Sequence, residues 1–119
     1  FLTTVTDNFE PHLRPQENGA HFDTQYAALT TVDGAGLLVT RTDAPFMMGA
    51  SHYSDAQMRD AHYAHELTPE PFTYLHLDAF QSGCGSYACG PLLDEAYQLK
   101  AGKHRLSVTL TPCRVDEVL

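Results

Sequence analysis

Two turn dipeptides constrain the fold of this sequence more than any other feature. Asn18-Gly19 and Asp33-Gly34 each pair residues that tolerate positive φ, the conformation that tight hairpin turns require. We therefore predict a hairpin in which residues 21–31 form one strand and residues 35–41 return as its more buried partner. In the first strand, apolar and polar side chains are expected on opposite faces: Phe22, Tyr26 and Ala28 against Asp23 and Gln25.

Three further segments have the composition and alternation of strands. They cover residues 46–53, which follow Pro45, residues 72–80 and residues 103–111. In the last of them the apolar residues share one face: Leu106, Val108 and Leu110. Short strands joined by turns at this spacing indicate a mainly β fold, an antiparallel β-sandwich that occupies residues 1–119 as a single domain.

One short helix is predicted between the third and fourth strands. Ser54 is a suitable N-cap, because its hydroxyl can accept a hydrogen bond from the free amides of the first turn. Met58, Ala61 and His62 follow at helical spacing, so the helix is expected over residues 55–65. Pro69 and Pro71 lie beyond its end: both disfavour a continuing helix.

The net charge limits the classes of binding partner, and the cysteine count indicates the cellular compartment. The net charge is −8 with only seven scattered Lys and Arg, which argues against nucleic acid and against an anionic membrane surface. No apolar run approaches the roughly 20 residues that span a bilayer. Cys84 and Cys89 could pair within a Gly-rich loop, but with Cys113 the count is odd, and a reduced, cytoplasmic setting is the simpler interpretation.

Histidines and acids offer only weak candidate sites. His62 and His65 are three apart and could share a helix face, with His52 as a third metal ligand, but this spacing differs from that of zinc proteases. Exposed polar histidines are the favoured interpretation. The acids best placed for a glycosidase pair are Glu66, Glu70 and Asp78. Their spacing singles out no pair, so no catalytic residue is predicted.

Four segments carry short motifs in a fixed order. They are Pro15-Gln16-Glu17-Asn18-Gly19, Ala50-Ser51-His52-Tyr53-Ser54, Leu75-His76-Leu77-Asp78-Ala79-Phe80-Gln81-Ser82-Gly83-Cys84-Gly85 and Tyr97-Gln98-Leu99-Lys100-Ala101-Gly102. In order and spacing they resemble the C-terminal domain of β-galactosidases of glycoside hydrolase family two. The resemblance covers nearly the whole chain.

This resemblance implies a large β-sandwich of the galactose-mutarotase-like type, of which the chain is the latter part. It also implies a retaining β-galactosidase as the parent, with its catalytic glutamates and its magnesium and sodium sites in other domains. No cofactor is therefore expected within these residues. The expected partners are the remaining domains of the parent, a galactoside substrate in the intact enzyme, and further copies in a homo-oligomer.

One functional position is carried over from the family. Its loop after the Gly-x-Gly holds a Trp that lines the sugar pocket, and the matching stretch here runs from Gly85 to Pro91. Alignment on Pro91 places Cys89 at the Trp position, with Tyr87 as the nearest aromatic residue, so Cys89 and Tyr87 are the predicted substrate-binding residues. Gln25 is a second departure, where many relatives carry Arg.

Two other functions stay open. The chain could be an autonomous carbohydrate-binding module, with Tyr87 or Tyr53 as a stacking platform, or an aldose-epimerase-like enzyme, since that fold is shared. A partial sandwich should leave sheet edges and apolar faces uncovered, so the isolated chain is expected to self-associate.

Overall fold

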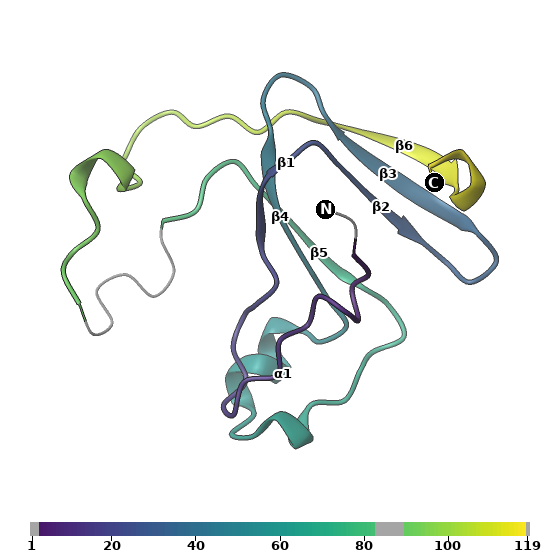
Figure 1. Cartoon of the computed structure of the whole chain (residues 1–119), viewed down its shortest axis with the longest axis horizontal. Coiled ribbons are helices and arrows are strands. Elements are labelled where there is room, and N and C mark those ends of the chain that lie inside the picture. The colour runs from purple at the N-terminus through teal and green to yellow at the C-terminus, as the bar shows by residue number, and fades with distance from the viewer. Residues whose placement is uncertain (1–2, 83–89, 119) are drawn as a thin grey trace. The chain divides into compact units, whose positions relative to one another are not determined.

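The computed structural model describes residues 3–82 and 90–118 and contains two three-stranded antiparallel sheets (Figure 1). The first has the strand order β1–β4–β5 and the second β2–β3–β6. The strands are β1 (His21–Thr24), β2 (Tyr26–Thr30), β3 (Ala35–Arg41), β4 (Phe46–Ser51), β5 (Tyr74–Asp78) and β6 (Val108–Arg114). Within the same described residues lie one α-helix, α1 (Asp55–Asp60), and three 3-10 helices: η1 (Ala64–Glu66), η2 (Glu95–Tyr97) and η3 (Val115–Glu117). The prediction of a mainly β fold with one short helix is confirmed.

The chain divides into two compact units. One comprises Phe1–Phe22 and Met48–Leu77, and the other Asp23–Met47 and Asp78–Leu119. The first contains α1 and most of the β1–β4–β5 sheet. The second contains the whole β2–β3–β6 sheet.

The predicted hairpin is present as β2 and β3. Gly34 has a φ of 84° and donates its N–H to the carbonyl of Thr31 at 2.9 Å, which closes the turn. The two strands then pair antiparallel from Thr30 opposite Gly36 to Tyr26 opposite Thr40. The confirmed strand β3 is also the more buried of the two, with Val39 fully buried.

The single strand predicted over residues 21–31 is wrong, because it is interrupted at Gln25, between β1 and β2. Asp23, within β1, has a φ of 54°, in the left-handed region that Asp tolerates better than most side chains. The two strands β1 and β2 belong to different sheets. Phe22 and Tyr26, expected on the apolar face of one strand, are instead 75% and 53% exposed.

The last strand begins later than predicted. β6 starts at Val108, where it meets Arg41 at the end of β3, and continues to Arg114 opposite Ala35. Residues 103–107 therefore lie before the strand, although the N–H of Thr42 still bonds the carbonyl of Ser107 at 3.2 Å. The predicted bounds of 103–111 are wrong because the length of β3 fixes where the ladder can form.

The remaining two strands are confirmed with shorter bounds. β4 covers six of the eight residues predicted over 46–53, directly after Pro45, and Phe46 at its start is 1% exposed. β5 covers the middle five of the nine residues predicted over 72–80.

The helix begins where predicted and ends early. The Ser54 hydroxyl accepts the N–H of Gln57 at 3.3 Å, which confirms the cap, and Met58 and Ala61 are buried. However, Ala61 is already extended, so the prediction of a helix over 55–65 is wrong beyond Asp60.

The carboxylate of Glu66 explains this early end. It accepts the N–H of His62 at 2.7 Å, a donor that a continuing helix would have bonded to its own backbone. His62 therefore lies beyond α1, and η1 follows as a separate turn.

Candidate functional site

The predicted sugar-binding residues, Cys89 and Tyr87, lie outside the described residues, as does Cys84. Their roles therefore stay predictions. The flanking segments are described: the hydroxyl of Ser82, just before this stretch, accepts the N–H of Leu99 at 3.2 Å. This hydrogen bond joins Ser82 to a residue seventeen positions further along the chain.

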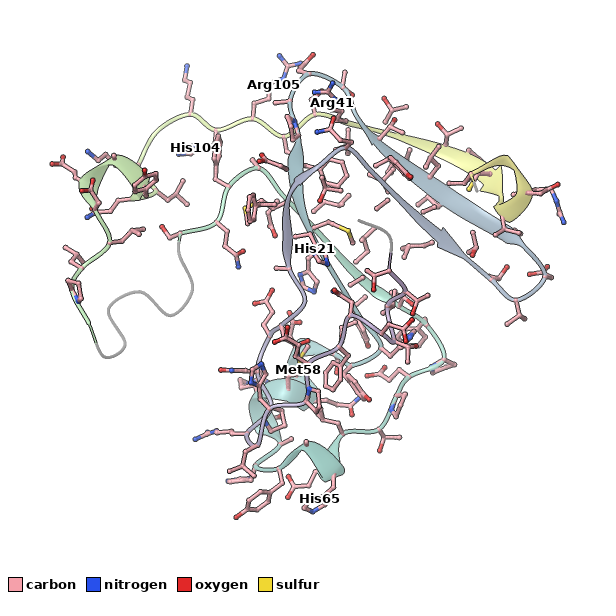
Figure 2. The ribbon with its side chains drawn as sticks, viewed as in Figure 1. His21, Arg41, Met58, His65, His104 and Arg105 are labelled. Atoms are coloured by element: carbon pink, nitrogen blue, oxygen red, sulfur yellow. The ribbon has the colours of Figure 1, made fainter. Side chains whose placement is uncertain are left out.

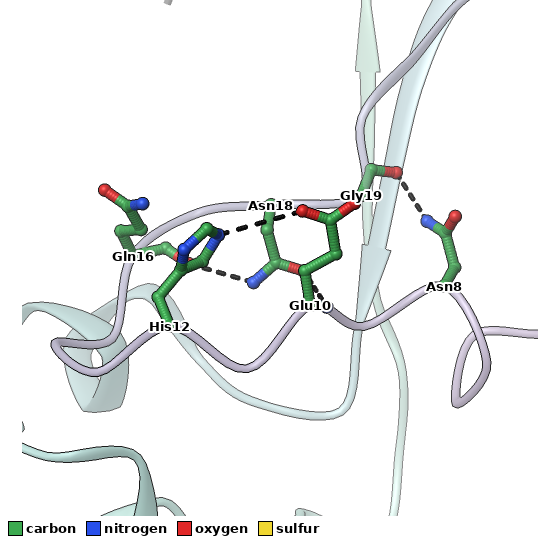
Figure 3. A network of polar contacts seen from close by, with 6 residues as sticks. All are labelled: Asn8, Glu10, His12, Gln16, Asn18 and Gly19. Atoms are coloured by element: carbon green, nitrogen blue, oxygen red, sulfur yellow. Dashed lines mark hydrogen bonds and ion pairs between the residues drawn. The ribbon is translucent and has the colours of Figure 1, made fainter. Parts of the chain in front are cut away.

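A network of polar contacts joins the segment around Asn18-Gly19 to residues 8–12 (Figure 3). Gly19 has the expected positive φ of 69°, but neither residue lies in a turn or bend, so the turn predicted from this dipeptide is wrong. Asn18 makes two hydrogen bonds here. Its Oδ1 accepts the N–H of Glu10 at 3.0 Å, and its Nδ2 donates to the carbonyl of Gln16 at 3.0 Å. His12 adds an ion pair with Glu10 at 3.9 Å when it is protonated.

Asn8 is the residue of this network that sequence reasoning missed. Its Nδ2 donates to the carbonyl of Gly19 at 2.6 Å, and its Oδ1 lies 2.7 Å from Nε2 of His21. Asn8 thus joins Gly19 to His21, the first residue of β1, whose side chain appears in Figure 2. The only sequence signal near this network was the Asn-Gly dipeptide, which indicated the positive φ of Gly19.

Two spaces open beside this segment. The smaller one, about 10 Å³, has room for about one water molecule. It is lined by Glu17, Asn18, Gly49, Ala50, Ser51, Met58 and His76. The larger, an open groove of about 460 Å³, has the volume of a small-ligand site. Its lining mixes opposite charges with about as much apolar as polar surface: Arg14, Pro15, Gln16, Glu17, Asp55, Met58 and Arg59.

Glu66, the first of the three candidate acids, accepts hydrogen bonds from the backbone. Its carboxylate accepts the N–H groups of His62 and Tyr63 at 2.7 and 3.4 Å. The bond from His62 is the main reason that the pKa of Glu66 lies below its usual value. A general acid in a glycosidase needs a raised pKa, so this environment does not suit that role.

Glu70 is held by side-chain donors. Tyr74 donates its hydroxyl to Oε2 of Glu70 at 2.7 Å, and Gln57 donates Nε2 to Oε1 at 2.6 Å. These bonds, that of Tyr74 foremost, lower the pKa of Glu70, and the same carboxylate raises the pKa of Tyr74. The group thus fastens α1 to β5. The third candidate, Asp78, is exposed at the end of β5.

The histidines form no metal site in the described part of the chain. There, no group of three or more His, Cys, Asp or Glu side chains is placed to hold a metal ion. His52 lies 3.3 Å from the hydroxyl of Thr6, and His65 stacks on Tyr63 with ring centroids 5.6 Å apart. The three histidines considered from sequence are therefore not brought together as ligands.

Tyr53, a candidate stacking platform, already packs on another ring. Its centroid lies 4.9 Å from that of Phe9 at a tilt of 52°, and the residue is only partly exposed. The described residues thus define a mainly β protein segment in which the carboxylates of Glu66 and Glu70 hold the fold.

Comparison with known proteins identifies the family. The chain matches the family described as β-galactosidase small chain over residues 1–110, and it belongs to this family. It is 44% identical over 99 residues to a β-galactosidase of Staphylococcus xylosus, covering 83% of this chain and 10% of that protein. It is 30% identical over 114 residues to a β-galactosidase of Streptococcus thermophilus, covering 94% of this chain and 11% of that protein. The chain thus spans about a tenth of the curated relatives it matches. Within the described residues, no helix is long and apolar enough to cross a membrane.

Proposed function

We propose that this chain is a structural, non-catalytic part of a β-galactosidase of glycoside hydrolase family two. The whole enzyme would hydrolyse terminal non-reducing β-D-galactose residues, as in lactose, by two-step displacement with retention. The observation that carries the proposal is the family match over residues 1–110, combined with relatives named β-galactosidase that are about ten times longer. The acids described above support it, because Glu66 and Glu70 hold the fold.

Within that enzyme, this chain would be the latter part of a galactose-mutarotase-like sandwich and would shape the active-site mouth. Residues 82–91 are the segment proposed for this role, with Tyr87 offering an aromatic face to the sugar and Cys89 beside it. Magnesium and sodium would be bound by other parts of the parent, which is proposed to be a cytoplasmic homo-oligomer.

A chimaera tests the proposal. In the Streptococcus thermophilus β-galactosidase, the segment matching this chain is deleted in one variant and replaced by this chain in another. Hydrolysis of a β-galactoside is measured for both and for the isolated chain. We expect activity only in the replaced enzyme. Hydrolysis by the isolated chain, or an inactive replacement, would contradict the proposal.

The two other functions have their own tests in the isolated chain. A carbohydrate-binding module would show amide shifts by NMR on titration with galactose, and an epimerase would speed the mutarotation of fresh α-galactose. We expect neither, since a loop without its opposite wall offers too little contact area to hold a sugar. Shifts confined to residues 83–91 would instead show that this segment binds the sugar unaided.

A further inference from the structure

The β2–β3–β6 sheet has two chemically different faces. The pairing places Val39 in one row with Ala27 and Leu110, and Leu37 in the next row with Leu29 and Pro112. Residues paired across antiparallel strands lie on the same face, so these six residues form one apolar face. The opposite face has three threonines among its six residues, and we call it the threonine face. It contains Tyr26, Ala28, Leu38, Thr40, Thr109 and Thr111.

The apolar face is covered at its centre and bare at its β6 side. Val39 is 0% exposed, whereas Leu110, its neighbour in the same row, is 56% exposed. Pro112 beside it is exposed as well. Leu110 and Pro112 lie two residues apart on the same face of β6, so they form one exposed apolar surface beside the buried Val39. Contiguous apolar surface of this kind marks an interface.

The β6 edge is less suited to a partner than the face. Thr42 with Ser107 and Gly34 with Val115 are hydrogen-bonded pairs, and such pairs alternate with non-bonded ones along antiparallel strands. Pro112 opposite Leu37 therefore falls in a non-bonded pair, where its nitrogen points away from β3 toward the open edge. Because proline has no N–H, it removes a donor from that edge and hinders the addition of another strand.

We propose that the apolar face at Leu110 and Pro112 packs against the rest of the β-galactosidase polypeptide. This inference rests on the proposed function. The relatives contain roughly nine tenths of their length outside the matched segment, which provides the occupant. The surface of this occupant is apolar. It packs on the face of the β2–β3–β6 sheet and does not add a strand at the edge of that sheet.

Two matched variants of β6 test the proposal in the chimaera described above. Leu110→Asp places a carboxylate on the apolar face, and Thr111→Asp places one on the threonine face at the next position. An unpaired charge buried at an interface is strongly unfavourable. We expect Leu110→Asp to lower β-galactosidase activity at least about ten-fold and Thr111→Asp to leave it within about two-fold.

The isolated chain provides the control for folding. Leu110 is exposed there, so both variants should keep the circular dichroism spectrum of the unaltered chain. Equal activity of the two variants in an active chimaera would overturn the inference alone. So would a Leu110→Asp variant that abolishes self-association of the isolated chain yet leaves the chimaera active, since the occupant would then be a second copy. An unaltered chimaera without activity would overturn the proposed function itself.

Discussion

Gly19 is a position where the structure predicts a large effect of a single methyl group. Its φ of 69° lies in the left-handed region, and a Cβ built there would overlap Nδ2 of Asn8 and lie 2.9 Å from the Asn8 carbonyl oxygen. Such contacts do not occur between real atoms, so Gly19→Ala must displace the segment around Asn8.

The cost can be worked from two contributions. A residue with a Cβ in the left-handed region costs about 1–2 kcal/mol. Displacing Asn8 also breaks its 2.6 Å bond to the carbonyl of Gly19, a loss of about 0.5–1.5 kcal/mol. We expect Gly19→Ala to lower the free energy of unfolding by about 1.5–3.5 kcal/mol, before the overlap with the Asn8 carbonyl is counted.

Urea denaturation followed by circular dichroism measures this change. Gly102→Ala is the matched control, because a Cβ there meets only Nε2 of His104 at 3.8 Å and the backbone is not left-handed. It should change stability by less than about 0.5 kcal/mol. Asn8→Ala should make the Gly19→Ala change smaller, since the nearest overlapping atom is gone. A Gly19→Ala variant as stable as the control would refute the reasoning.

Three other predictions concern the carboxylate of Glu70, the helix cap at Ser54 and the association of the isolated chain. Hydrogen bonds, chiefly from Tyr74, lower the pKa of Glu70, so its stabilising effect is present above its ordinary pKa of 4.5 and is lost as the pH falls through the lowered value. Glu70→Gln should therefore flatten the acid side of the stability curve measured by thermal melting; an unchanged acid limb would contradict this. Ser54→Ala should destabilise the chain by about 1 kcal/mol in urea denaturation through the lost cap, and a change near zero would count against it. The isolated chain should self-associate in light scattering, which a monodisperse monomer would disprove.

Local signals predicted much of the fold. The Asp33-Gly34 dipeptide located the hairpin, and Ser54 located the start of α1, because turn and cap chemistry depend on adjacent residues. The left-handed backbone of Asp23 and the interruption between β1 and β2 could not be predicted this way. An aspartate accepts both extended and left-handed backbone, and the choice depends on which sheet each flanking segment joins.

Long-range contacts limited what could be said of the site. The positive φ of Gly19 was indicated by the Asn-Gly dipeptide, but Asn8, eleven residues before Gly19, carries no pattern that predicts a hydrogen bond to it. The acids were similarly ambiguous. Spacing singled out no pair among them, and only the structure shows that Tyr74 and Gln57 donate hydrogen bonds to the carboxylate of Glu70.

The apolar pattern and the observed burial disagree in an informative way. Leu110 and Phe22 occupy positions that alternation assigns to a core, yet both are largely exposed. Among the described residues, the buried apolar side chains are Val39, Phe46, Met58 and Ala61. Alternation reports the surface that a strand buries in a complete protein, whereas the structure reports burial within a chain that spans about one tenth of its relatives. On the proposed function, the exposed positions mark where the parent enzyme completes the core. The stability of this segment should accordingly rise when the remainder of that enzyme is present, as for any protein that binds a partner only in its folded state.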